Sequence, residues 1–390
     1  MEMVQVNVSI NLNSISDKFT DKMKLNLESL NKYEFQIPFF LPKLYRKEGT
    51  ESEKLISTEM RSSITEKITE WLEYQFPARF RPGSASIIAS HVTAYVEFCC
   101  PQFSMNSSEF ECVVKSTAIP LLIDFFADRK ELFENHDDDE FINGVQLLVK
   151  IFQEGIRQGA DLLGDESQTE FFKLEEIHDN KFASMFLGVV SDLVFETFET
   201  FDIGGKTEEW KNYLKKMFAN AMIGFSSRNG EISDCSVNTF RFFRSMGGTL
   251  AQLMEIVVML KECILSGRVS EDPIFLRFSG LVNEISASLN DLLGLQKDVR
   301  NGEEEGGIIL WRVQKGTDFK VVLDEEVAVL KENIRDYGML RNLLLTKYGN
   351  EDGNLQDYLN ITDSVLFGMF QVFAESDVYG MKDQIRIDMD

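Results

Sequence analysis

Apolar residues recur at spacings of three and four along most of the chain, which is the period of an amphipathic α-helix. The pattern runs through residues 64–76, 87–98, 110–126, 141–156, 182–201, 210–223, 250–265, 275–295, 321–345 and 355–373. No segment shows convincing strand alternation. Because only short polar joins rich in glycine and acidic residues separate these segments, the sequence predicts an all-α chain folded as a single large helical bundle.

The first 30 residues are polar and have no sustained period, so we expect a flexible N-terminal arm at residues 1–30. The following segment, YEFQIPFFLPKLYRKE, places Pro38 and Pro42 among aromatic residues. Proline disfavours helix at its own position and at the residue before it, which predicts an extended strap across the helical body. Residues 31–390 contain no internal repeat and no linker, and we expect them to form one domain.

The chain carries 64 acidic and 40 basic residues, a formal net charge of −24. Such a chain repels the phosphate backbone of nucleic acids. No stretch approaches the roughly 18 uninterrupted apolar residues of a membrane-spanning helix, and the first residues lack the basic start and apolar core of a secretory signal. We therefore expect a cytoplasmic protein with no nucleic-acid partner and no membrane span. Monomer and homodimer both remain open.

An acidic stripe ends one of the most apolar predicted helices. In the segment STAIPLLIDFFADRKELF, Asp124, Asp128 and Glu131 follow at positions i, i+4 and i+7, which lie on one face of a helix. Carboxylates among apolar residues need a compensating cation, and oxygen ligands without histidine or cysteine favour a hard ion such as magnesium. The alternative is a solvated helix end.

A second polar stripe lies in the segment LVNEISASLNDLLGLQKDVRNGEE, where Asn290, Gly294 and Asp298 share one face beside Lys297. NDLLGLQKD resembles the NDxxSxxKE motif with which class I terpene synthases bind magnesium. In that family the asparagine, the serine or threonine, and the final glutamate are ligands, which the resemblance carries to Asn290, Gly294 and Asp298. Aspartate at 298 keeps a carboxylate on a shorter arm. Glycine at 294 cannot coordinate, so a water would take its place.

Arg244, followed by Gly247 and Gly248, resembles the diphosphate-sensing arginine of the same family and the helix break after it. In bacterial members this arginine lies some 46 positions before the motif asparagine, and Arg244 lies 46 positions before Asn290. A guanidinium offers a fork of donors to diphosphate oxygens, and glycine at the break lets a backbone carbonyl face the substrate. The alternative is a surface arginine followed by a helix-capping glycine.

Other landmarks follow in the family's order. YEFQIPFFLP resembles the strap that opens the catalytic domain, and the helix ending in DFFAD occupies the place of the aspartate-rich helix, with Phe125 where a second aspartate is usual. GMFQVFAESDVYG resembles the closing segment, in which Tyr379 is retained and Val378 replaces an arginine. The similarity covers residues 33–380 and is of microbial or octocoral type.

The resemblance implies a class I terpenoid synthase-type bundle around a central apolar cavity, and a terpene cyclase that uses about three magnesium ions. Geranylgeranyl diphosphate is the favoured substrate, and farnesyl diphosphate is the second candidate. The implied metal ligands are Asp124, Asp128, Glu131, Asn290 and Asp298; the implied catalytic groups are Arg244, Gly248, Lys297 and Tyr379. Aromatic faces can stabilise a carbocation, and the candidates are Phe125, Phe126, Phe240 and Phe373, each of which core packing would also explain.

Two other functions remain open. An isoprenyl diphosphate chain elongase on the same fold would need a second aspartate-rich site, and the sequence has none of that kind. A non-catalytic helical interaction protein would have acidic stripes that are merely solvated, and the departures at Phe125, Gly294 and Val378 keep that alternative open.

Overall fold

The computed structural model describes residues 2–42, 51–77, 79–134, 139–148, 179–200, 235–246, 249–303, 307–376 and 378–388. In the first half of the chain its elements are β1 (Glu2–Asn11), α1 (Asp21–Leu27), β2 (Lys32–Leu41), α2 (Glu51–Gln75), α3 (Ser84–Cys99), α4 (Ser108–Asp128), the 3-10 turn η1 (Lys130–Leu132) and α8 (Lys181–Thr200). In the second half they are α10 (Val237–Met246), α11 (Thr249–Leu260), α12 (Gly267–Ser270), α13 (Pro273–Leu293), α14 (Leu295–Asn301), α15 (Ile308–Gln314), α16 (Phe319–Tyr348), α17 (Leu355–Glu375) and β3 (Ile385–Asp388).

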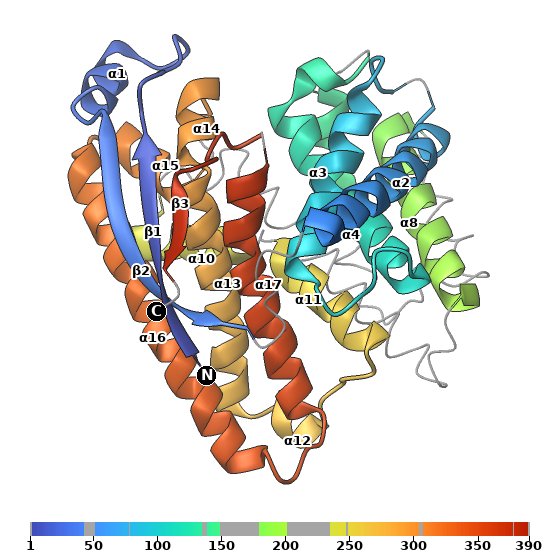
Figure 1. Ribbon diagram of the computed structural model, residues 1–390. Helices are drawn as coiled ribbons and strands as arrows, with labels where there is room; N and C mark the ends of the chain where they lie inside the picture. Colours follow the sequence, from blue (N-terminus) through green and yellow to red (C-terminus); the bar gives the residue numbers. More distant parts are fainter. Residues whose placement is uncertain are drawn as a thin grey trace.

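The body of the molecule is helical, as the apolar period predicted (Figure 1). Eight of the ten predicted segments coincide with α2, α3, α4, α8, α11, α13, α16 and α17. Of the segment 141–156, residues 141–148 are helical and the rest lies outside the described residues, as does the segment 210–223. The all-α prediction is confirmed for the body, and a small sheet is added to it.

The prediction of a flexible arm at residues 1–30 is wrong. Residues 2–11 form β1, which pairs antiparallel with β2 on one side and β3 on the other, so that both ends of the chain share a sheet of order β2-β1-β3. Val4, Val6, Val8 and Ile10 alternate with polar residues and are all buried. This period of two, typical of a half-buried strand, went unnoticed because every second residue is polar.

The sheet covers the helices through β2, whose extended course the sequence predicted. Phe39 places its ring edge-on to Phe370 of α17, at 5.0 Å between centroids, and Phe40 contacts Tyr337 of α16 at 5.6 Å. A Cβ atom at Gly338 would overlap the Phe40 ring. Glycine at this position is therefore what allows β2 to lie directly on α16.

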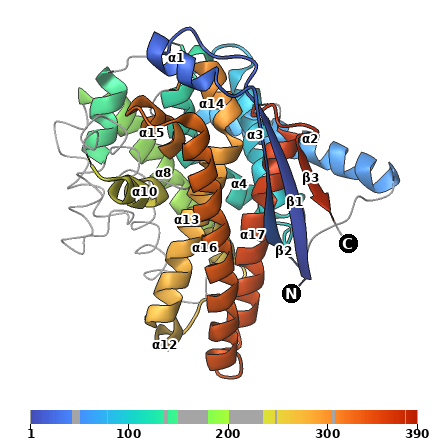
Figure 2. The same ribbon diagram turned by 90° about the vertical axis from the view of Figure 1, so that its left-hand side faces the viewer.

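The long helices set the direction of the bundle. α13, α16 and α17 run along the molecule in both views, with α12 at one end and α14 at the other (Figures 1 and 2). α17 begins beside the α12 end, where Ser266 hydrogen-bonds to Asp352 at 2.8 Å and Asn354 to the Ile264 carbonyl at 2.9 Å. The C-terminal halves of α13 and α17 therefore both point toward the α14 end of the bundle.

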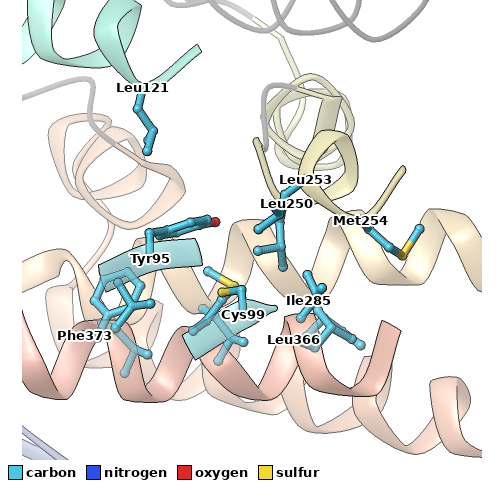
Figure 3. Packing of buried hydrophobic residues seen from close by; sticks show 14 of the residues in the cluster. Tyr95, Cys99, Leu121, Leu250, Leu253, Met254, Ile285, Leu366 and Phe373 are labelled. Atoms are coloured by element: carbon cyan, nitrogen blue, oxygen red, sulfur yellow. The ribbon is translucent and has the colours of Figure 1, made fainter. Parts of the chain in front are cut away.

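The core joins the two halves of the bundle through α11, which packs against α4 on one side and against α13 and α17 on the other. Leu250 and Leu253 of α11 lie near Ile285 of α13 and Leu366 of α17 (Figure 3). Leu121 of α4 belongs to the same core. Among the described residues no helix combines the length and the apolar character needed to cross a membrane.

Candidate active site

Gly294 marks the turn from α13 into α14, where the resemblance leads one to expect serine or threonine. Its N–H donates to the Asn290 carbonyl at 2.8 Å, and its own carbonyl accepts from the Asp298 N–H at 3.0 Å. A Cβ atom here would lie 2.6 Å from the Asn290 oxygen, a distance that side chains essentially never adopt. Close passage of the backbone thus favours glycine at 294, which gives a physical reason for the missing hydroxyl.

Backbone hydrogen bonds of the helical i to i+4 kind continue across this turn, from Gly294 to Asn290 and from Asp298 to Gly294. Asp298 is buried, and its Oδ2 lies 3.8 Å from the point where a Cβ at 294 would stand. The partly exposed side chain of Asn290 makes no hydrogen bond within the described part of the chain. Amide and carboxylate oxygens are the ligands that magnesium prefers, so the donor set fits this ion.

Lys297, near the start of α14, pairs with one carboxylate of the same helix and one that follows it. Its Nζ lies 3.4 Å from Asp298 Oδ1 and 3.3 Å from Glu303 Oε2, and all three side chains are largely shielded from solvent. Glu303 lies in one of the polar joins rich in glycine and acidic residues, and the sequence did not predict it as a site residue. Its place five residues after Asp298, just beyond a short helix, is the signal that could have identified it as a further oxygen donor.

Arg244 is paired with Asp291, the residue next to Asn290. Its Nε and Nη2 donate to Asp291 Oδ1 at 2.9 and 2.7 Å, and Asp291 Oδ2 accepts from the Ile308 N–H at 2.9 Å. Asp291 is only 2% exposed. A Cβ at Gly307 would lie 2.7 Å from this carboxylate. Asp291 therefore joins α10, α13 and the start of α15, a role that the sequence did not predict because position 291 is not a ligand position of the motif.

α10 is also fixed from its other side. Arg241 donates to the buried carboxylate of Glu326 in α16 through Nη2 at 2.7 Å, and Arg312 of α15 donates to the same oxygen at 2.7 Å. Phe240 stacks on Trp311 with the ring centroids 4.5 Å apart. These contacts hold the helix that carries Arg244. Gly248, at the predicted helix break, lies outside the described residues.

The acidic stripe predicted for Asp124, Asp128 and Glu131 is shorter in the structure than the sequence indicated. α4 ends at Asp128, and Glu131 lies in η1, where its exposed carboxylate pairs with Arg129. The prediction that Glu131 continues the helical stripe of Asp124 and Asp128 is therefore wrong, because the helix ends before it. The side chains of Asp124 and Asp128 lie outside the described part. Among the described residues no three acidic, histidine or cysteine side chains group as a metal site, so the predicted site depends on these aspartates.

The C-terminal segment contacts α14 directly and reaches α4 through His91 of α3. His91 of α3 lies edge-on to Phe125 of α4 at 5.6 Å and contacts the Tyr379 ring at 5.7 Å, measured between ring centroids. Tyr379 in turn lies 4.0 Å from Phe373 of α17. The same segment is tied to α14, because Gln296 donates to the Gly380 carbonyl at 3.2 Å. Arg300 of α14 donates to the Val378 carbonyl at 3.2 Å.

The aromatic candidates occupy different surroundings. Phe126 stacks on Phe133 at 3.8 Å and on Phe141 at 5.9 Å, with Phe182 edge-on, which favours plain core packing. Phe240 stacks on Trp311, which also favours a packing role for its ring. Phe125 and Phe373 are buried beside His91 and Tyr379, and they remain the better candidates for contact with a substrate.

Glu255 is an acid that the sequence interpretation passed over. It stands in the middle of the apolar helix α11, is partly buried, and makes no hydrogen bond within the described part of the chain. Burial raises the pKa of its carboxyl from 4.5 to about 8. Tyr358 of α17 faces it: burial, followed by the charge of Glu255, raises the pKa of that phenol.

We expect Glu255→Gln to stabilise the chain at alkaline pH. The folded chain holds the proton of Glu255 more tightly than the unfolded chain, so the ionised carboxylate opposes folding. This penalty is absent below pH 4.5, grows as the pH rises from 4.5 to about 8, and is complete above that value. After discounting for the remaining exposure, the variant should raise the free energy of unfolding by about 1 to 3 kcal/mol at pH 8.5 and by much less at pH 5.

Urea denaturation at both pH values measures this difference. Glu271→Gln, which changes an exposed acid after α12, is the matched control and should be near neutral at either pH. An equal gain for Glu255→Gln at both values would show that the carboxyl titrates normally.

Comparison with known proteins gives no match at the level of sequence. No protein-family model matches the chain. No curated protein matches it either. Solved structures do match, and all of those described next are bacterial-type terpene synthases at very low sequence identity.

The chain is similar to 2-methylisoborneol synthase from Streptomyces coelicolor A3(2), with a TM-score of 0.59 and 10% identity over 88% of this chain and 99% of that one. Linalool/nerolidol synthase from Streptomyces clavuligerus gives a TM-score of 0.59 and 11% identity over 80% and 96%. A variant of cucumene synthase gives 0.57 and 12% over 81% and 94%. The chain therefore has the class I terpene synthase fold, as the sequence resemblance implied.

Proposed function

We propose that the chain is a magnesium-dependent terpene cyclase, which ionises a linear isoprenyl diphosphate and cyclises the resulting carbocation. Geranylgeranyl diphosphate is the favoured substrate, and farnesyl diphosphate is the second candidate. One observation carries the proposal: a guanidinium, a partly exposed amide and two shielded carboxylates gather at the α14 end of a class I terpene synthase fold. They belong to Arg244, Asn290, Asp298 and Glu303.

Each group has a definite task in this proposal. Magnesium held by Asn290, Asp298 and an aspartate of α4 would neutralise the diphosphate leaving group. Arg244 uses Nε and Nη2 for Asp291, which leaves Nη1 to donate to a diphosphate oxygen. Such a bond strengthens as the carbon–oxygen bond breaks and negative charge gathers on the oxygen, so it lowers the barrier selectively. Lys297 adds a second positive charge beside the same oxygens.

The solved relatives of this fold support the proposed ligands. The 2-methylisoborneol synthase structure contains Mg²⁺ and geranyl-S-thiolodiphosphate, and a linalool/nerolidol synthase structure contains 2-fluorogeranyl diphosphate. Shared fold alone does not fix chemistry. The support comes from the coincidence of that fold with an oxygen donor set suited to magnesium and an arginine suited to diphosphate.

Incubation of the purified chain with magnesium and geranylgeranyl or farnesyl diphosphate tests the proposal. We expect cyclic hydrocarbons, detected by gas chromatography with mass spectrometry, together with released diphosphate in equal amount. Chelation of the metal with excess EDTA should abolish both signals, and renewed magnesium should restore them, because the leaving group then loses and regains its counter-charge.

The same assay separates the two other functions. Isoprenyl diphosphates longer than the substrate would identify a chain elongase and contradict cyclisation. No turnover of any isoprenyl diphosphate, by a chain whose circular dichroism shows it to be folded, would favour a non-catalytic interaction protein.

A further inference from the structure

Gln296 of α14 lies where this helix meets the first strand and the C-terminal segment, residues 378–384. β1 runs toward the α14 end of the bundle (Figure 1), and the N–H of its last residue, Asn11, donates to Gln296 Oε1 at 3.2 Å. Gln296 Nε2 donates to the Gly380 carbonyl at 3.2 Å. One partly buried amide therefore connects the beginning of the chain and its end to the helix that carries Asp298.

The orientation of α14 depends on such contacts. The helix has seven residues, Leu295–Asn301, and a helix this short is marginal by itself. Residues four apart lie on one helical face, whereas residues two apart point about 200° away from each other around the axis. Gln296 therefore shares a face with Arg300, which donates to the Val378 carbonyl at 3.2 Å, and this face points away from Asp298. The C-terminal segment holds α14 from the side opposite its predicted metal ligand.

The same segment also reaches the other helix that carries predicted metal ligands. Tyr379 contacts the His91 ring, and His91 lies edge-on to Phe125 of α4. Phe125 directly follows Asp124, the first predicted ligand of α4. Contacts therefore run from α14 through Gln296 and the C-terminal segment to α4, so that the amide links the positions of the two helices.

We propose that Gln296 is a positioning residue of the candidate site, which orients α14 so that Asp298 can share a metal ion with Asn290. Gln296 itself contacts neither the metal ion nor the diphosphate. Its hydrogen bonds fix the rotation of α14, in the way that partners of metal ligands commonly hold those ligands in place. The inference rests on the proposed function, and it gives a role to a position of NDLLGLQKD that is not a ligand position of the motif.

Magnesium binding in the presence of inorganic diphosphate tests this role without requiring turnover. Gln296→Met removes both hydrogen bonds of the amide and keeps a side chain of similar length. Isothermal titration calorimetry on the full chain should show that the Kd for magnesium rises roughly fivefold. In turnover assays the variant should need about fivefold more magnesium for its half-maximal rate, while the rate at saturating magnesium stays within about twofold of wild type. This split is expected because Gln296 acts through Asp298 and not on the substrate.

Gln384→Met is the matched control. Gln384 Nε2 donates to the same Gly380 carbonyl at 2.9 Å, but from within the C-terminal segment. The control therefore removes a hydrogen bond from the same acceptor and leaves α14 tied to the segment, so its Kd for magnesium should equal that of wild type. Urea denaturation of the three chains measures how much of each is folded under the conditions of the titration.

The outcomes separate this inference from the proposed function. A wild-type Kd in Gln296→Met, an equal loss of affinity in Gln384→Met, or no magnesium binding by the wild-type chain with inorganic diphosphate would each overturn the role of Gln296. A loss of affinity that a larger unfolded fraction accounts for would overturn it as well. Specific weakening in a folded Gln296→Met variant of a chain that turns over no isoprenyl diphosphate would uphold Gln296 as a positioning residue and reject the cyclase.

Discussion

Replacing Asp291 by alanine should lower the free energy of unfolding by about 3 to 5 kcal/mol, because it leaves the charge of Arg244 without its partner in a largely buried position. The variant also removes the acceptor of the Ile308 N–H, which loses its hydrogen bond at the start of α15. Thermal or urea denaturation followed by circular dichroism measures the loss. The free energy of unfolding of Asp291→Asn should lie between those of wild type and Asp291→Ala, because its amide oxygen can still accept from the Ile308 N–H but carries no charge.

Glu284→Ala provides the control for this prediction on the same helix. Glu284 pairs with Arg277 near the surface, with side-chain exposures of 33% and 51%. Exposed ion pairs contribute about 0 to 1 kcal/mol, so this variant should change the stability little. Similar losses for Asp291→Ala and Glu284→Ala would mean that the buried pair does not hold α10, α13 and α15 together.

The helices could be predicted because their apolar residues repeat with a helical period over many residues. In α13 and α17, for example, this period continues for more than five turns. The sheet was missed for the opposite reason. Residues 2–11 bury only one face, and their polar alternate residues made the segment look like a solvated arm. β3 has four residues and gains its place only by pairing with β1, which a local pattern in a short terminal segment does not reveal.

The site was partly predictable for a similar reason. The alignment of Asn290 with Asp298 follows from helical spacing, so these two residues could be placed on one face before the fold was known. The partner of Arg244 does not follow from spacing, because it depends on how α10 crosses α13. The reason for Gly294 depends on a backbone distance within a turn.

Asn290→Ala should lower the rate of isoprenyl diphosphate turnover by at least about tenfold, while the free energy of unfolding stays within about 1 kcal/mol of wild type. The amide of Asn290 has no partner in the described part of the chain, so its removal breaks no internal contact there. Its loss would remove an oxygen ligand from the proposed magnesium site. Steady-state kinetics at several magnesium concentrations should show the greatest loss of rate at low magnesium.

Arg244→Ala is the informative comparison, because the two residues differ in what they hold in the folded chain. From spacing alone, both replacements would be expected to reduce turnover and spare the fold. The structure changes the second expectation for Arg244, whose removal leaves the buried carboxylate of Asp291 without its counter-charge and should destabilise the chain by several kcal/mol. Asn290→Ala therefore isolates the chemistry, and a normal rate in a stably folded Asn290→Ala variant would contradict the assignment of this residue as a metal ligand.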